Sequence, residues 1–155
     1  MQKTGFTLIE LLVVISVIAI LIGIAVPRFK GMQDEANISK ANAELRVLET
    51  AVESYNMNQT PNAYPASATT LCAAYLNNAT PNIVGDVLTD PFRSAGAEYN
   101  YIRSANGEYF VVFSYGPDGA ADITGIGDDG VLTGVEDDDL NATNGTGASQ
   151  RLSRH

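Results

Sequence analysis

The sequence predicts an α+β protein: a long N-terminal α-helix, a small C-terminal antiparallel β-sheet head, and a loop-rich acidic tail. Three observations predict this fold class. Residues 6–26 are almost wholly apolar, and residues 33–56 repeat apolar side chains at helical spacing. Residues 99–102 and 108–114 are rich in aromatic and β-branched side chains and are joined across an Asn-Gly pair, which is a strong hairpin signal.

The apolar segment is long enough to cross a membrane. Phe6 to Val26 is 21 residues, and a helix rises about 1.5 Å per residue, which spans the hydrocarbon core of a bilayer. The segment contains one carboxylate, Glu10. A charged group in hydrocarbon is unfavourable by about 3 kcal/mol or more, so Glu10 is a candidate functional residue. Only Met1–Gly5 precede the segment, which is unlike an ordinary secretory signal, where the cleavage site follows the apolar region.

The second helical segment is amphipathic. Pro27 is expected to end or kink the apolar helix. Beyond it, residues 28–57 carry an apolar stripe that is predicted to pack on the protein's own head rather than on a partner coiled coil. The stripe consists of Ala41, Leu45, Leu48, Val52 and Tyr55. Arg28 and Lys30 lie at the membrane boundary, so charge counting with Lys3 leaves the orientation open.

Residues 58–155 form the predicted head and tail. A short helix is expected over Thr69–Asn77, with Leu71, Ala74, Tyr75 and Leu76 as packing residues and Cys72 as a small buried side chain. From Gly116 onward Gly, Asp, Asn and Thr dominate, which predicts little core and a flexible loop unless another part of the chain ties it down.

Composition excludes several classes of function. The net charge is −9, and no Lys or Arg occurs between Arg103 and Arg151, which argues against nucleic-acid binding and permits a divalent cation. The single cysteine allows no intrachain disulfide. No metal-hydrolase or nucleophile-elbow motif is present, and the only histidine, His155, ends the chain, so no enzyme is predicted.

The head of the chain, Gly5-Phe6-Thr7-Leu8-Ile9-Glu10, resembles the class III leader of type IV pilins and type II secretion pseudopilins. The resemblance implies that a prepilin peptidase removes residues 1–5 by cutting after Gly5, and that the new amino terminus, Phe6, is N-methylated. It also implies that the helix 6–27 first anchors the protein in the inner membrane and later packs with copies of itself in a filament. Glu10 would then pair with the Phe6 amine of a neighbouring subunit. A plain membrane anchor with an incidental glutamate is the alternative.

Motifs in the head narrow the resemblance to the major pseudopilin of type II secretion. Tyr64-Pro65 followed by Leu71, Asp90-Pro91-Phe92 and Ser114-Tyr115-Gly116-Pro117-Asp118-Gly119 occur in that family's order. In the family the last of these opens a calcium-binding loop, which implies a calcium site in this chain. The candidate ligands are the Tyr115 carbonyl, Asp118 and two later aspartates, with the choice among Asp122, Asp128 and Asp129 left open. Arg93–Gly96 and the spacing of the acids after Asp118 depart from the family pattern, and a solvated acidic loop is the alternative.

The sequence therefore predicts a structural subunit that forms a homopolymeric helical filament, the periplasmic pseudopilus of a type II secretion system. The resemblance implies a single-pass inner-membrane protein with its head in the periplasm. Its implied partners are the prepilin peptidase, the inner-membrane assembly platform and minor pseudopilins. Two alternatives stay open: a subunit of a surface type IV pilus used in adhesion, motility or DNA uptake, and a membrane-anchored calcium-binding protein that never polymerises.

Overall fold

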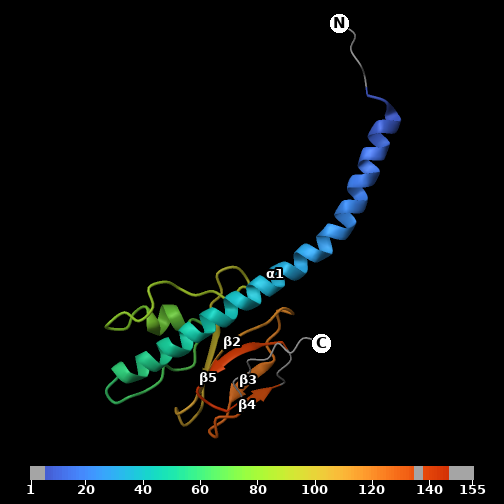
Figure 1. The fold of residues 1–155 in the computed structure, drawn as a ribbon. Coiled ribbons are helices and arrows are strands. Elements are labelled where there is room, and N and C mark those ends of the chain that lie inside the picture. Colours follow the sequence, from blue (N-terminus) through green and yellow to red (C-terminus); the bar gives the residue numbers. More distant parts are fainter. Residues whose placement is uncertain (1–5, 135–137, 147–155) are drawn as a thin grey trace. The chain divides into compact units, whose positions relative to one another are not determined.

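The structure, a computed structural model, describes residues 6–134 and 138–146 (Figure 1). The chain divides into two compact units, residues 1–36 and residues 37–155. One long helix, α1, spans Leu8–Asn58 and therefore belongs to both units. Of the two outcomes predicted for Pro27, an end to the helix does not occur, because α1 continues past this residue. A proline removes one backbone donor, and the other hydrogen bonds of a 51-residue helix remain.

Two small sheets and a short π-helix make up the rest of the second unit. The π-helix η1 spans Cys72–Leu76. A three-stranded antiparallel sheet has the order β1-β2-β5, and a two-stranded antiparallel sheet pairs β3 with β4. The strands are β1 (Asn100–Arg103), β2 (Phe110–Ser114), β3 (Ile123–Ile126), β4 (Leu132–Gly134) and β5 (Leu140–Thr143). The fold class predicted from the sequence is confirmed.

The apolar stripe of α1 packs on the inner face of the three-stranded sheet, as predicted. Ala41, Leu45, Leu48 and Val52 are at most 1% exposed, and Tyr55 is half-buried against them. They share one core with the side chains that η1, β1, β2 and β5 turn toward the helix, namely Leu76, Tyr101, Phe110, Val112, Leu140 and Ala142. Burial of these side chains is the main favourable contribution to the stability of the head.

Every residue of β2 is buried, because both faces of this strand are covered. Phe110 and Val112 point into the core below α1, whereas Val111 and Phe113 belong to a second cluster with Ile123 and Ile126 of β3. The predicted hairpin over residues 99–114 is thus confirmed, with β1 and β2 in antiparallel register from Asn100↔Phe113 to Arg103↔Phe110.

The prediction of a loop from Gly116 onward is wrong for the part of the tail that the structure describes. This part contains β3, β4 and β5, and all four residues of β5 are buried. Ile123, Ile126 and Leu132 supply enough apolar surface to cover the outer face of β2. The other parts of the predicted tail, residues 135–137 and 147–155, lie outside the described residues.

The predicted helix over Thr69–Asn77 is shorter than expected. Leu71, Cys72 and Leu76 are buried, but Ala74, which was predicted to pack, is exposed. The buried carboxylate of Glu98 accepts hydrogen bonds from the backbone N–H groups of Cys72 (2.6 Å) and Ala73 (3.3 Å), so it satisfies donors that the start of a helix leaves open. Burial raises the pKa of the Cys72 thiol, as expected for a packing residue rather than a nucleophile.

Candidate functional site

The first candidate site is the start of α1, where Thr7 and Glu10 form a reciprocal cap. The Thr7 backbone N–H and hydroxyl donate to Glu10 Oε2 at 2.8 and 2.7 Å. The Glu10 N–H in turn donates to Thr7 Oγ1 at 3.4 Å. This is the capping-box arrangement, in which Thr stands immediately before the helix and Glu three residues later. Sequence reasoning missed Thr7, although Thr-x-x-Glu before an apolar run is the sequence pattern of a capping box.

The helix that follows the cap exposes its apolar side chains. Leu8, Ile9 and Ile20 are each more than 60% exposed, and no apolar side chain described between residues 6 and 26 is buried. α1 is the helix, among the described residues, that is long and apolar enough to cross a membrane on length and composition. The hydroxyl of Ser16 donates to the Leu12 carbonyl at 2.8 Å, so this polar group is satisfied by its own helix. Glu10 is therefore the one charged side chain on the segment 6–26.

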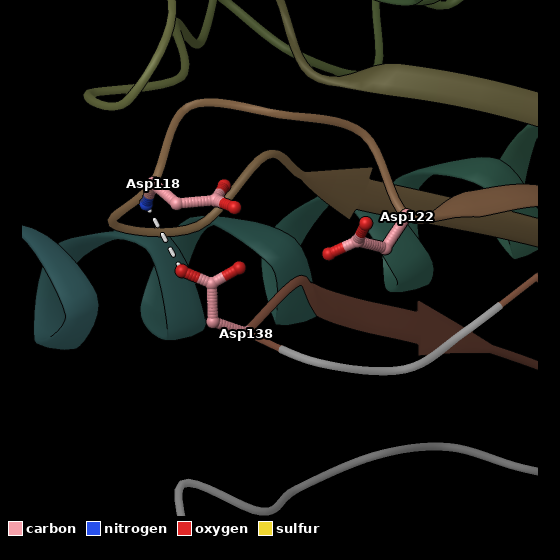
Figure 2. A group of neighbouring side chains, drawn as sticks. All are labelled: Asp118, Asp122 and Asp138. Atoms are coloured by element: carbon pink, nitrogen blue, oxygen red, sulfur yellow. Dashed lines mark hydrogen bonds between the residues drawn. The ribbon is translucent and has the colours of Figure 1, made fainter.

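The second candidate site is an acidic cluster in the head. Asp118 and Asp122 lie on the loop between β2 and β3, and Asp138 lies just before β5. Figure 2 shows the three carboxylates turned toward a shared space, with one oxygen of each within 4.8 Å of the others. Two oxygens on opposite sides of one Ca²⁺ ion are about 4.6–5.2 Å apart. The group could therefore hold a metal ion.

Hydrogen bonds fix this cluster from the side of β5. Asp138 Oδ2 accepts from the Asp118 N–H at 3.0 Å, the bond that is drawn in Figure 2. The buried Asp139 Oδ2 accepts from the N–H groups of Asp122 and Ile123, both at 2.8 Å. Through these bonds, the two aspartates that precede β5 hold the loop that carries Asp118 and Asp122.

Some carboxylate oxygens in this region have no hydrogen-bond partner among the described residues. Asp122 Oδ2 and Asp139 Oδ1 are examples, and both atoms are buried. Burial raises the pKa of Asp139, and the nearby charges of Asp122 and Asp138 act in the same direction. A buried acceptor without a donor is unfavourable, and a cation held by the cluster would satisfy the Asp122 oxygen.

Gly116 brings the loop close enough for these contacts. Its φ is +68°, a left-handed conformation that favours glycine. A Cβ atom at this position would lie 2.3 Å from the carbonyl oxygen of Asp138. The loop and the Asp138 segment can approach this closely only because residue 116 has no side chain.

The cluster includes Asp118 and Asp122 of the predicted ligands and leaves out Asp128 and Asp129. Asp128 Oδ1 accepts from the Asn106 N–H at 2.7 Å, and Asp129 Oδ1 accepts from the Val131 N–H at 3.1 Å. Both lie in the turn between β3 and β4, which separates them from the cluster along the chain. Sequence reasoning missed Asp138, which stands 20 residues after Asp118 in the acidic run before β5.

Comparison with known proteins decides the family. The family model described as "Type II secretion system (T2SS), protein G" matches residues 28–139, and the model of the prokaryotic N-terminal methylation motif matches residues 1–26. The chain belongs to the type II secretion system protein G family. This is a family of structural pseudopilins rather than of enzymes, and its apolar N-terminal helix fits a membrane-anchored, single-pass protein.

Individual relatives agree over most of their length. The type II secretion system core protein G of Dickeya chrysanthemi is 30% identical over 130 residues, which cover 78% of this chain and 82% of the relative. The protein of the same name from Klebsiella michiganensis is 32% identical over 146 residues, covering 88% and 91%. The one from Escherichia coli (strain K12) is 28% identical over 144 residues, covering 90% and 91%. No solved structure matches the chain significantly.

Proposed function

We propose that this chain is the major subunit of the pseudopilus of a type II secretion system, a filament built from copies of the chain that moves folded proteins out of the periplasm. The observation that carries the proposal is the pair of family matches, which together extend from residue 1 to residue 139. The role is structural, with no catalytic step. The apolar, exposed segment of α1 supports it, because such a surface needs lipid or other copies to cover it.

Processing and assembly follow from the N-terminal segment. A prepilin peptidase would cut after Gly5, and the amine of Phe6 would then be methylated. In a filament core the Glu10 carboxylate needs a cationic partner, and the Phe6 amine of a neighbouring subunit exists only after the cut. Before assembly, the Glu10 carboxylate accepts hydrogen bonds from the Thr7 N–H and hydroxyl, which partly stabilise its charge.

The head would lie in the periplasm and bind one Ca²⁺ ion. Asp118, Asp122 and Asp138 would be side-chain ligands, and the Tyr115 carbonyl would supply a backbone oxygen. Calcium takes six to eight oxygens in flexible geometry, so three carboxylates plus backbone oxygens and water would complete the shell. The buried Asp122 oxygen without a hydrogen-bond partner supports this assignment.

Further protein partners of the chain would be the inner-membrane assembly platform and minor pseudopilins.

A clean deletion in the native host tests the filament role. The culture supernatant is scored for secreted proteins and the cell surface for fibres by electron microscopy. We expect secreted proteins to be trapped in the periplasm while surface fibres are unchanged. Loss of surface fibres with normal secretion would instead identify a type IV pilin and overturn the proposal.

Thermal melting of the full-length chain in detergent tests the calcium site. We expect a chelator to lower the melting temperature of the wild type, and Asp118→Ala to lower it further in a way that added Ca²⁺ does not rescue. Asp86→Ala is the matched control, because Asp86 is an exposed aspartate of the same head outside the cluster. Identical wild-type melting curves with and without chelator would rule out the site.

A further inference from the structure

Asp90 has a buried carboxylate outside the acidic cluster. It binds Tyr115, at which the loop with Asp118 and Asp122 begins. Asp90 is 3% exposed, and its two oxygens accept three hydrogen bonds. Oδ1 accepts from the Ser114 hydroxyl at 2.7 Å and from the Phe92 N–H at 2.9 Å, and Oδ2 accepts from the Tyr115 N–H at 3.1 Å. The Asp90 side chain therefore fastens the turn around residue 90 to the end of β2.

The same turn also holds the side chain of Tyr115. The guanidinium carbon of Arg93 lies 4.6 Å from the centre of the Tyr115 ring, a cation–π contact. Arg93 Nη1 donates to Asn100 Oδ1 at 3.1 Å, and Asn100 Nδ2 donates to the Tyr115 hydroxyl at 3.0 Å. Tyr115 is thus held at its backbone by Asp90 and at its ring by Arg93 and Asn100.

These contacts with Tyr115 fix the start of the loop that carries Asp118 and Asp122, two of the three aspartates of the cluster. Tyr115 is followed by Gly116, and the loop then reaches Asp118 within three residues. Gly116 and Gly119 both have positive φ, so the loop contains positions with wide conformational freedom in the unfolded chain. A loop that must bring carboxylates within 4.8 Å of one another binds a cation more tightly when its start is already fixed.

We propose that Asp90 is a positioning residue for the acidic cluster: it fixes Ser114 and Tyr115 so that Asp118 and Asp122 meet Asp138 in a geometry ready for a cation. The inference rests on the cation site in the proposed function. Asp90 itself does not touch the cation. It acts through the backbone of Tyr115, as outer groups in metal sites do when they orient the ligands.

The test measures Ca²⁺ affinity by titration calorimetry on the full-length chain in detergent, with melting in chelator as the second readout. Asp90→Asn keeps the size of the side chain but replaces one acceptor oxygen with an NH₂ group. We expect it to raise the Kd for Ca²⁺ at least about tenfold, the usual effect of removing an outer orienting group. The control is Asp86→Asn, an exposed aspartate four residues earlier on the same segment, with an unchanged Kd.

A purely structural role for Asp90 gives a different result. The melting temperature of Asp90→Asn would then fall equally with chelator and with Ca²⁺, and its Kd would equal that of the wild type. That outcome overturns the positioning role and leaves the cation site intact. Absence of Ca²⁺ binding by the wild type would overturn both, and the deletion phenotype would still decide the filament role.

A milder variant covers the case in which Asp90→Asn does not fold. Ser114→Ala removes one of the three hydrogen bonds to Asp90, at a side chain that is 0% exposed. We expect a rise of several-fold in the Kd for Ca²⁺, smaller than for Asp90→Asn because the bond from Tyr115 remains. An unchanged Kd for a folded Ser114→Ala would contradict the proposal.

Discussion

The two halves of α1 differ in whether their apolar side chains are buried. In the second half, Leu45, Leu48 and Val52 are buried by the chain's own sheet. In the first half, side chains such as Leu12 and Ile18 are about half exposed or more. The head can therefore be stabilised from within, whereas the apolar segment depends on lipid or on other copies.

The difference assigns separate tasks to the two regions. A change in the apolar segment should alter assembly and leave the stability of the head as it was. A change in the core of the head should alter stability first and assembly only as a consequence. Substitutions that violate this separation would show that the two regions are coupled.

The largest effect is expected from Glu10→Ala. Removal of the carboxylate removes the proposed partner of the Phe6 amine, so we expect filament assembly and secretion to be lost. Head stability should be unchanged, because Glu10 bonds only to Thr7 among the contacts described. Assembly is measured by cross-linking neighbouring subunits in intact cells and immunoblotting, and head stability by urea unfolding in detergent.

Ser16→Ala provides the control for this change. Ser16 lies on the same apolar segment, and its hydroxyl bonds to its own helix at Leu12. We expect normal secretion from Ser16→Ala. Normal secretion from Glu10→Ala would show that the carboxylate is incidental and that the segment is a plain anchor.

A second prediction compares two neighbouring positions in the other half of α1. Leu45 is 1% exposed, and Val47 is 52% exposed. Leu45→Ala should lower the free energy of unfolding by about 2–5 kcal/mol, because it leaves a cavity in the core. Val47→Ala should change it by about 0.5 kcal/mol or less. Equal effects of Leu45→Ala and Val47→Ala in urea unfolding would mean that the apolar stripe is not part of the core of the head.

A third prediction concerns the close approach at the acidic cluster. Gly116→Ala places a methyl group where the Asp138 carbonyl lies, at a φ of +68°. We expect a loss of about 1–3 kcal/mol from the backbone conformation alone, and weaker Ca²⁺ binding because Asp138 must move. Gly85→Ala is the control, since an added Cβ there meets no atom within 4 Å. Unchanged stability and affinity for Gly116→Ala would contradict the described loop geometry.

Sequence reasoning succeeded where the signal is local. The stripe from Ala41 to Val52 follows the helical period, and the β1–β2 hairpin has Asn106-Gly107 between two β-rich runs. Each of these patterns lies within a short window of sequence. The head motifs and the N-terminal motif were likewise contiguous, which is why the family could be predicted.

Sequence reasoning failed where the structure depends on distant partners. β5 pairs with β2, about 30 residues earlier, and its four residues Leu-Asn-Ala-Thr show no clear strand pattern. β4 has only three residues and ends at Gly134. Asp138 joins Asp118 across the β3–β4 hairpin, so no spacing rule in the sequence links the two. Leu132 of β4 packs on the cluster that contains Val111 and Phe113. β5 is instead fixed by its pairing with β2 and by the burial of Leu140 and Ala142 in the core with α1, rather than by its own composition.

The smallest effect is expected from Tyr64→Phe, a test of the head alone. Burial, and then the neighbouring Glu53 carboxylate, raise the pKa of Tyr64 from 10.0 to about 12. The folded chain therefore keeps the phenolic proton at pH values where the unfolded chain has lost it. This contribution to stability is fully present below pH 10 and is lost as the pH rises toward 12.

Tyr64→Phe should thus reduce the alkaline loss of stability, while lowering stability near neutral pH by about 1 kcal/mol or less through the lost bond to Glu53. The hydroxyl lies 3.0 Å from both Glu53 oxygens. The alkaline slope should shrink rather than vanish, because burial also raises the pKa values of Tyr99 and Tyr101. Urea unfolding between about pH 8 and pH 11 measures both effects. If the unfolding free energy of Tyr64→Phe fell with pH as steeply as that of the wild type, Tyr64 would ionise as freely in the folded chain as in the unfolded one. The hydrogen bond to Glu53 would then not contribute to the stability of the head.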